Sequence, residues 1–364
     1  MLDSNVDWES QGDSANAREV RSVVTLRKQK ILKAIVDEHV ETSLPVSSQS
    51  VANRLPESVS AATVRNDIAE LEVGGYVVRP HHSAGGVPSD KGYRAYVEFL
   101  GEIPEPSPQV KRFIRLQLHH AHMDMEAWSQ TASQLLAGLV HTMAICTLPR
   151  APEARWKHLE LIQVQEFLAL LVMVLQESRV RQQMVPLKEP ATQDQLAQIS
   201  NRLNSVFSNL SRSEIRARNV DLTSLERDVT GVALEMLKEE QDEKIPDYYV
   251  DGLRLLFRYP ELAPGSRARE VTEVLEDRQT MRALLSEATD AEGVRVAIGK
   301  ENRPENLHSF SIIFAQYGLP SAASGVVGIV GPTRMEYANA ISSVRYLASV
   351  MSEMLEMVRG RAAS

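Results

Sequence analysis

The chain has 364 residues, of which 43% are hydrophobic, so it is long enough for two or three domains with buried cores. Its formal net charge of −8 is unusual for a protein that binds DNA, so any such binding must rely on a local patch and weaken with salt. Because Cys146 is the only cysteine, an intramolecular disulfide and a cysteine-based zinc finger are both excluded, which suits a reducing cytoplasm.

Charged residues are spread unevenly along the chain. Residues 1–17 hold four acidic residues and no basic one, whereas eleven Lys and Arg oppose ten Asp and Glu between Arg18 and Glu98. The N-terminal segment has no apolar core, so it is not a signal peptide, and we expect a disordered tail over residues 1–22. The longest apolar run, Phe167 to Leu175, is shorter than the stretch of about 20 residues that crosses a bilayer. We therefore expect a cytoplasmic protein without membrane contact.

Three helices are predicted between residues 23 and 73. The first spans Leu26 to Val40 and ends at a proline-containing turn, and the second follows a serine cap at Ser47 or Ser48. Ser60 suits the N-cap of the third helix, because its hydroxyl can accept a hydrogen bond from a free backbone N–H of the first turn. The apolar face of this third helix carries Val64, Ile68 and Leu71.

The opposite face of the third helix carries residues that can read bases. Ala62 is small enough to let the helix lie deep in a major groove. Asn66 can form paired hydrogen bonds to adenine, Arg65 can do the same to guanine, and the Thr63 methyl group can touch a thymine methyl group. These groups crowd the first two turns, where recognition helices usually touch bases. We therefore predict a DNA recognition helix that ends at the glycine pair 74–75.

A short hairpin is predicted after this helix. Tyr76 to Arg79 is a β-branched and aromatic run, residues 80–86 have turn chemistry, and Val87-Pro88 begins the return strand. Ser89 can cap a further helix, whose apolar stripe comprises Tyr93, Tyr96, Val97 and Leu100. A helix followed by a glycine-tipped hairpin is typical of a winged helix, although an ordinary helix–hairpin–helix packing unit has the same pattern. The pattern favours DNA binding over that alternative.

A proline-rich stretch at residues 102–108 predicts a stiff linker and a domain boundary. A long helical stretch follows, from Gln109 to about His141. On it, His119, His122 and Glu126 share one face and could bind a metal ion, but a solvated face with incidental histidines explains them better. We therefore expect neither a metal ion nor a cofactor.

The remainder of the chain mixes strands and helices. Two strands are predicted within residues 158–175 and a third from Arg179 to Leu187. Residues 190–245 contain two amphipathic helices, which predict a helical insertion into a β-rich domain. The first of these helices needs a partner for an apolar stripe at Leu196, Leu203, Val206 and Leu210. After the insertion we predict a helix at 266–287, strands at 294–299, 309–317 and 325–330, and a final helix at 334–359.

Several stretches resemble one protein family. SAATVRNDIAELE at residues 60–72 and GYVVRPHHSAGGVPSDKGYRAYV at residues 75–97 are similar to the recognition helix and the wing of the HrcA family of heat-inducible transcription repressors. Further similarities to this family lie at residues 251–262, 298–302 and 331–337. The blocks keep the family's order, which is much more specific than one helix-turn-helix match.

The wing departs from the family pattern at three positions. Gly86 stands where the family usually has Arg, and His82 and Ser89 stand where it usually has Thr. Loss of the arginine would remove a phosphate or minor-groove contact. We therefore expect that Gly86→Arg would tighten DNA binding.

The resemblance implies a multidomain α+β fold with an N-terminal winged helix-turn-helix. It also implies a GAF-like α+β domain, which is interrupted by a mainly helical inserted dimerising domain. The expected boundaries place the winged-helix domain at 23–102, the GAF-like domain at 103–188 and 246–364, and the inserted dimerisation segment at 189–245.

The resemblance further implies a repressor of chaperone operons of the groE and dnaK type. Such a repressor would bind an inverted-repeat operator in double-stranded DNA as a homodimer and be released on heat stress, with a GroEL-type chaperonin as partner. The residues expected to contact bases are Ala62, Thr63, Arg65 and Asn66. The residues expected to contact phosphates are Ser60, Arg79, His82, Ser83, Lys91 and Arg94, although Arg79 and Arg94 could equally be ordinary surface charges.

Two other functions fit parts of the sequence. A metabolite-sensing winged-helix regulator would hold a ligand in the GAF-like domain, with the glycine-rich segment 324–328 as a pocket wall, but glycines for close strand packing explain this segment better. An enzyme is not expected, because the chain has no recognisable nucleophile motif, Walker loop or dinucleotide fingerprint. Arg334 and Glu336 do not form a catalytic pair, since residues at i and i+2 do not share a helix face.

Overall fold

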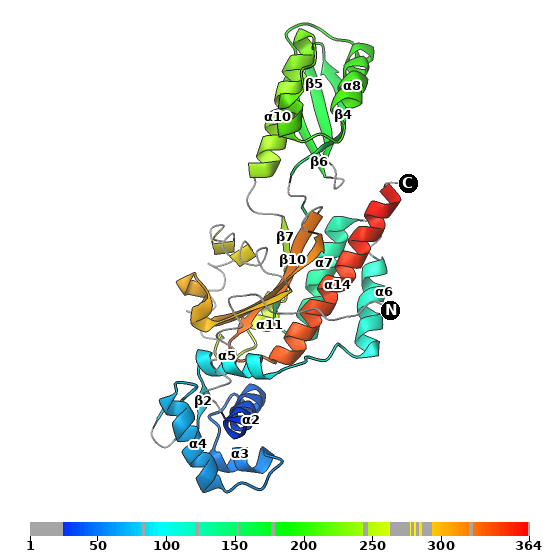
Figure 1. Ribbon diagram of the computed structural model, residues 1–364. Coiled ribbons are helices and arrows are strands. Elements are labelled where there is room, and N and C mark those ends of the chain that lie inside the picture. Colours follow the sequence, from blue (N-terminus) through cyan, green and yellow to red (C-terminus); the bar gives the residue numbers. More distant parts are fainter. Residues whose placement is uncertain are drawn as a thin grey trace. The chain divides into compact units, whose positions relative to one another are not determined.

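The protein is a mixed α+β chain, shown here as a computed structural model (Figure 1). The structure describes residues 25–81, 84–120, 124–150, 153–175, 179–242, 247–262, 277, 280–281, 284–285, 293–319 and 323–362. These residues fall into two compact units. Unit 1 lies within Met1–Leu148, Asp247–Tyr317 and Gly325–Ser364, and unit 2 lies within Pro149–Pro246 and Gly318–Ser324.

The N-terminal part of unit 1, which we call the head, contains four helices and a small hairpin. Its elements are α2 (Leu26–Thr42), α3 (Ser48–Arg54), α4 (Ala61–Val73), β1 (Val77–Val78), β2 (Val87–Pro88) and α5 (Asp90–Phe99). The predicted helices and hairpin therefore form at the expected places. Ile35 of α2, Val51 of α3 and Val64 of α4 are fully buried, because each lies on the apolar face of its helix and these faces meet.

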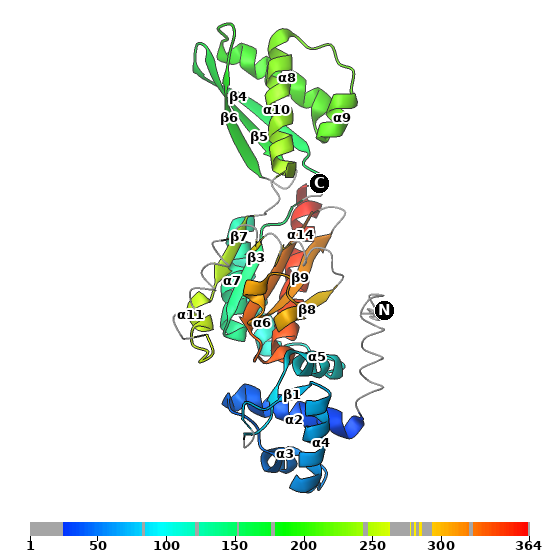
Figure 2. The same cartoon turned by 90° about the vertical axis from the view of Figure 1, so that its left-hand side faces the viewer.

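The rest of unit 1 is built on a five-stranded sheet in the order β7-β3-β10-β9-β8. Its strands are β3 (Met143–Thr147), β7 (Tyr248–Asp251), β8 (Val294–Ile298), β9 (Phe310–Leu319) and β10 (Ala323–Pro332). Beside this sheet lie α6 (Pro108–His120), α7 (Met125–Val140) and α14 (Tyr337–Ala362), as both cartoon views show (Figures 1 and 2). A short helix, α11 (Leu253–Leu256), follows β7, and two 3-10 turns at Gly299–Glu301 and Glu305–Leu307 follow β8.

The long helix predicted from residue 109 to about residue 141 is two helices. The second begins at Asp124, whose side chain accepts a hydrogen bond from Glu126 N at 3.0 Å. It ends at His141, which has a left-handed φ of 55°. The predicted helix at 266–287 lies mostly outside the described residues, as does the tail at 1–22.

Unit 2 combines a three-stranded sheet with three helices. Its elements are β4 (Trp156–Gln165), β5 (Leu168–Leu175), β6 (Val180–Pro186), α8 (Gln193–Phe207), α9 (Arg212–Ala217) and α10 (Ser224–Asp242). The three predicted strands therefore do not join the five-stranded sheet, and the unit begins near residue 149 rather than at 189. The physical reason is that strands and helices share one core, in which Leu171 and Met173 of β5 lie with Leu203 and Phe207 of α8. The segment is consequently α+β and not mainly helical.

The apolar stripe of α8 does not need a second subunit. Leu196 and Leu203 are fully buried, and Val206 packs against the same core at a half-buried position, as does Leu210, which follows the end of α8. The prediction that this stripe lacks a partner within its own chain was wrong, because the hairpin strands cover it. The exposed apolar surface of unit 2 lies instead on its sheet.

Candidate nucleic-acid interface

Helix α4 is fixed in the head by a cap and by a partly buried ion pair. The Ser60 hydroxyl accepts a hydrogen bond from Thr63 N at 3.1 Å, as predicted for an N-cap. Asp67, on the inner side of α4, is only 2% exposed, and it accepts two hydrogen bonds of 2.8 Å from the Arg27 guanidinium of α2. The hydrogen bond and the charge of Asp67 raise the pKa of Arg27. A paired contact of this kind fixes the rotation of α4 about its own axis.

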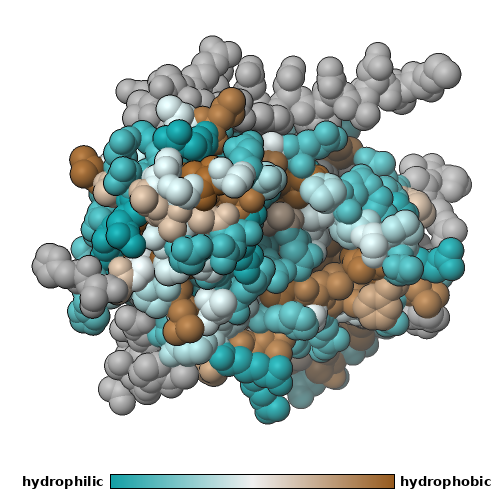
Figure 3. Space-filling view, turned by 90° about the horizontal axis from the view of Figure 1, so that it is seen from below, coloured by the Kyte–Doolittle hydropathy of each residue, from teal (hydrophilic) through white to brown (hydrophobic). Residues whose placement is uncertain are grey.

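With this rotation fixed, the predicted base-reading residues point away from the head core. Ala62, Arg65 and Asn66 are exposed, and Thr63 is half-buried beside the cap. Within the described part of the chain, no hydrogen bond or ion pair involves the side chain of Arg65 or Asn66. Seen from below, the molecule presents mainly hydrophilic residues with smaller apolar areas between them (Figure 3).

Other cations of the head are already engaged with acidic side chains. Lys28 lies 2.5 Å from Glu70, and Arg54 forms ion pairs with Glu38 and Glu41. These pairs neutralise much of the local charge, which agrees with the near balance of acids and bases in this region. Arg65 is therefore a cation of α4 that is available for a ligand.

The hairpin is tied to the loop after α2. Strands β1 and β2 pair in antiparallel fashion, with Val77 opposite Pro88 and Val78 opposite Val87. Val46 N donates to Gly86 O at 2.9 Å, and Gly86 N donates to Val46 O at 2.8 Å, so Gly86 belongs to the paired backbone and not to the tip. Two predicted phosphate-binding residues of the wing, His82 and Ser83, lie outside the described residues.

Gly86 is buried, so an arginine there would have to displace its neighbours before it could add a DNA contact. A Cβ atom on Gly86 would lie 2.6 Å from Cγ1 of Val77, which is too close for an undisturbed structure. The sequence places Gly86 in a turn, whereas the structure directs its Cβ position toward Val77.

We expect Gly86→Arg to destabilise the chain by about 1–3 kcal/mol, the usual cost of overpacking a filled site. Urea unfolding of the full-length variant measures this change. Val77→Ala removes the obstructing methyl groups and should restore part of the loss when it is combined with Gly86→Arg. If Gly86→Arg, alone and combined with Val77→Ala, unfolds at the wild-type urea concentration, the close packing around Gly86 is not as described.

Arg79 and Lys91 hold the hairpin against the end of α4. The Arg79 guanidinium lies 3.1 Å from the Glu72 carboxylate. Lys91 donates to the Gly74 carbonyl at 2.9 Å and lies 4.5 Å from the centre of the Tyr76 ring. A cation at the C-terminal end of a helix binds carbonyl groups that lack helical partners. Both residues thus have a structural role, and their contact with phosphates stays a prediction.

Arg94, which the sequence suggests as a phosphate ligand, binds groups of its own chain in the structure. Its Nε donates to Glu301 Oε1 at 2.7 Å, its Nη2 donates to the Val296 carbonyl at 2.6 Å, and the same nitrogen also contacts Glu301 Oε2. These partners belong to β8 and the turn after it. Sequence spacing cannot reveal this contact, because Glu301 is 207 positions away along the chain.

The glycine-rich strand β10 leaves no room for a ligand at its glycines. A Cβ atom on Gly325 would lie 2.5 Å from the Tyr317 ring, and one on Gly328 would lie 1.9 Å from the Phe314 ring. The glycines therefore serve close packing of β10 against β9 side chains. The packing at these glycines favours the close-packing explanation of segment 324–328 over its use as a pocket wall.

The described residues contain neither a grouping of side chains for a metal ion nor a helix that could cross a membrane. Within them, no three His, Cys, Asp or Glu side chains are grouped so that they could hold a metal ion. His122, one member of the trio weighed above, lies outside the described residues. No described helix combines the length and the apolar character that crossing a membrane requires.

Comparison with known proteins gives matches over nearly the whole chain. A sequence model of the HrcA protein C-terminal domain matches residues 126–341. The heat-inducible transcription repressor HrcA of Dehalococcoides mccartyi (strain BAV1) is 36% identical over 340 residues, which cover 93% of this chain and 98% of that protein. The protein of the same name from Herpetosiphon aurantiacus is 38% identical over 339 residues, covering 90% and 94% of the two chains.

One solved structure shares the fold. A crystal structure of a hypothetical protein at 2.2 Å resolution aligns with a TM-score of 0.61 and 24% sequence identity. The alignment covers 92% of this chain and 99% of that chain. The fold described above therefore also occurs in an experimental structure.

Proposed function

Because the chain belongs to the HrcA family of heat-inducible transcription repressors, we propose that it represses chaperone operons of the groE and dnaK type. It does so by binding an inverted-repeat operator as a homodimer. The observation that carries this proposal is the outer face of α4, where Arg65 and Asn66 are exposed and have no partner among the described residues. Footprinting of the purified chain on the upstream regions of chaperonin operons tests it.

In this proposal the head, residues 23–102, is a winged-helix domain. Helix α4 enters the major groove, and the hairpin from Val77 to Pro88 is the wing beside it. Arg79 and Lys91 reach phosphates as well as bracing the hairpin. An inverted repeat is read by one head per half-site, with half-site centres one helical turn, about 34–36 Å, or a multiple of it apart.

The remainder of unit 1 is then the GAF-like domain, at residues 103–148, 247–317 and 325–364. Unit 2, residues 149–246 and 318–324, is the inserted dimerising domain. This assignment moves the strands β4, β5 and β6 from the GAF-like domain to the inserted one, and their separate sheet supports it.

The open face of the unit 2 sheet supports its role in dimerisation. Its apolar side chains are Ile162, Leu168, Leu170, Val172, Val174, Val180 and Met184. Ile162, Val180 and Met184 are 44%, 59% and 51% exposed, respectively. The register places Leu170 between Ile162 and Met184, so these three form one continuous row across the sheet.

The opposite face of this sheet is filled by its own helices. Leu196 and Leu203 of α8 and Val229 of α10 share the buried core with the inward residues of β5. An apolar face without such a cover marks an interaction surface. A second copy of the same face meets the requirement of two-fold symmetry, since an isologous contact pairs one patch with itself.

The open face of the unit 2 sheet also suggests how heat releases the chain from its operator. We propose that heating separates the dimer, which removes the gain from binding both half-sites at once. The exposed apolar sheet then becomes a binding surface for a GroEL-type chaperonin and an aggregation surface. Free chaperonin raises the active fraction, and misfolded proteins compete for it.

We therefore expect a mild heat pulse to lower operator binding and chaperonin to restore it. Operator binding measured before and after the pulse, with and without purified chaperonin and ATP, tests this expectation. An inactive chaperonin variant is the control for simple crowding by added protein. Unchanged binding after the pulse, or recovery that does not depend on active chaperonin, would contradict the proposed release mechanism.

A further inference from the structure

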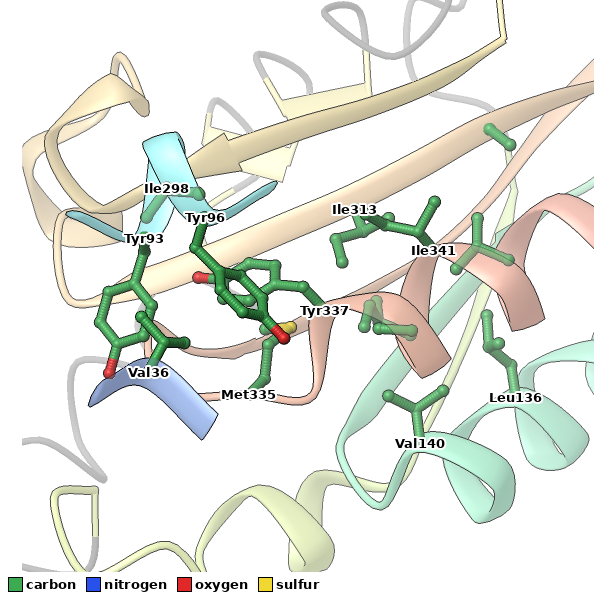
Figure 4. Close-up of a cluster of buried hydrophobic side chains, with 14 of the residues drawn as sticks. Val36, Tyr93, Tyr96, Leu136, Val140, Ile298, Ile313, Met335, Tyr337 and Ile341 are labelled. Carbon is green, nitrogen blue, oxygen red and sulfur yellow. The ribbon is translucent and has the colours of Figure 1, made fainter. Parts of the chain in front are cut away.

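The head and the sheet of unit 1 share one hydrophobic core (Figure 4). Val36 of α2 and the rings of Tyr93 and Tyr96 of α5 meet Tyr337 at the start of α14. The ring centre of Tyr337 lies 5.8 Å from that of Tyr93 and 6.4 Å from that of Tyr96. Burial raises the pKa of both α5 tyrosines, so their hydroxyls stay protonated, and Tyr96 donates to Asp37 at 2.9 Å. We call this contact between head and sheet the junction.

One side of the junction is closed by contacts of α5 with the turn after β8. Arg94 forms the ion pair with Glu301 and the hydrogen bond to the Val296 carbonyl described above. Asp90 accepts a hydrogen bond from Lys300 N at 3.2 Å. Gly299 has a φ of +54°, and a Cβ atom there would lie 2.3 Å from the Asp90 carboxylate. Glycine is therefore needed for this close approach.

The other side of the junction is closed by Arg334. Its Nη1 donates to the Val40 carbonyl at 2.7 Å, in the last turn of α2, where helix carbonyls lack intrahelical partners. Its Nε and Nη2 each lie 3.1 Å from the Glu261 carboxylate, and its guanidinium lies 5.6 Å from the Tyr259 ring centre. The Arg334 side chain is only 12% exposed. One side chain thus joins the end of α2, the segment after α11 and the start of α14.

We propose that Glu301 and Arg334 are positioning residues for operator binding, because they hold the head, and with it α4, in one orientation on the five-stranded sheet of unit 1. This inference rests on the proposed dimeric repressor function. Neither residue touches the outer face of α4, so the junction leaves that face exposed. The residues that read DNA lie in unit 1, whereas the proposed dimer surface lies in unit 2.

A rigid head increases the affinity that a bound dimer gains from its second half-site. Once one head is bound, the effective concentration of the other at its half-site depends on how narrowly its position is restricted. A head held at two sides of the junction keeps that concentration high at one spacing of the half-sites and low at others. A loosened head keeps its contacts with a single half-site but loses most of the gain from the second.

Full-length Glu301→Gln and Arg334→Lys variants test the inference. Glu301→Gln keeps the shape of the side chain and removes the negative charge that faces Arg94. Arg334→Lys keeps the positive charge and removes the planar guanidinium group. Glu353→Gln is the matched control, since Glu353 pairs with Arg115 at 2.8 Å between α6 and α14 and does not touch the head. Thermal unfolding followed by circular dichroism shows whether each variant folds.

Three duplexes serve as probes. The first is an operator that the wild-type chain enriches from random-sequence DNA, the second has its half-sites moved apart by about two base pairs, and the third keeps one half-site and scrambles the other. Wild type should bind the first duplex at least about tenfold more tightly than the second. Both junction variants should bind the first duplex with an affinity at least about tenfold below that of wild type, so that they bind the first two duplexes nearly equally. Their affinity for the single half-site should equal that of wild type. The control variant should behave like wild type.

Two outcomes would overturn the inference while leaving the repressor function intact. The first is a junction variant that keeps both the affinity and the spacing preference of wild type. The second is a folded variant that loses single half-site binding to the same extent as operator binding, because the residue would then act on the head itself. A wild-type chain that enriches no inverted repeat, or shows no spacing preference, would refute the proposed dimeric function and this inference with it.

Discussion

Replacing Arg65 or Asn66 by alanine should lower operator affinity by about 2–6 kcal/mol, which corresponds to about 1–3 kcal/mol for each lost base contact in the two heads of a dimer. Both side chains lie on the outer face of α4 and are exposed. The groups that fix α4, among them the Ser60 cap and the pair of Asp67 with Arg27, remain in place in both variants. The loss should therefore appear in DNA binding and not in stability.

Affinity measurements on operator DNA and on unrelated DNA separate specific from general effects. Arg112→Ala is the matched control, because Arg112 is an exposed cation of α6 outside the head. It should change binding little on either DNA, whereas Arg65→Ala should reduce the preference for the operator. If Arg65→Ala and Asn66→Ala both protect the operator as wild type does, the outer face of α4 is not the reading surface.

Placing a charge on the open face of the unit 2 sheet should give monomers. Leu170 lies in the middle strand between Ile162 and Met184, so Leu170→Glu puts one carboxylate into the contact from each subunit. Loss of two buried leucines costs about 3 kcal/mol or more, which is roughly a 100-fold or larger increase in the dimer Kd. Operator affinity should fall with it, because each head then binds alone.

Sedimentation velocity over a range of concentrations measures this Kd. Gln183→Glu is the matched control, since Gln183 is exposed on β6 and pairs with Leu171, whose side chain faces the helices and not the open face. It adds the same charge on the other side of the sheet and should leave the dimer unchanged. A Leu170→Glu chain that remains a dimer would place the interface elsewhere, for example on the five-stranded sheet.

The sequence predicted helix α4 well because the signals for it are local. Ser60, the apolar spacing of Val64, Ile68 and Leu71, and the glycine pair after them lie within one short segment and each acts on the backbone beside it. The exposed positions of Arg65 and Asn66 follow from that spacing alone. Helix periodicity is therefore enough to place the candidate site, although not to show what it binds.

The errors arose where distant segments decide the structure. β4, β5 and β6 look like strands of any sheet, and only their pairing and the core that they share with α8 assign them to unit 2. β3 was missed because its five residues are all buried, so it shows no alternation and follows a helix directly.

Arg94 and Gly86 show the same limit at the level of single residues. Each lies near the predicted wing, which favours a DNA contact. In the structure Arg94 contacts Glu301, and Gly86 lies beside Val46 and Val77. The local sequence pattern identifies none of these neighbours.

Footprinting of the full-length wild-type chain on the upstream regions of its host's chaperonin operons tests whether the chain binds an inverted-repeat operator there. We predict protection of an inverted repeat, with one protected major groove in each half-site related by two-fold symmetry, and loss of both protected grooves together in the Arg65→Ala chain. Protection of a single asymmetric site, or no protection at concentrations that saturate unrelated DNA, would contradict it.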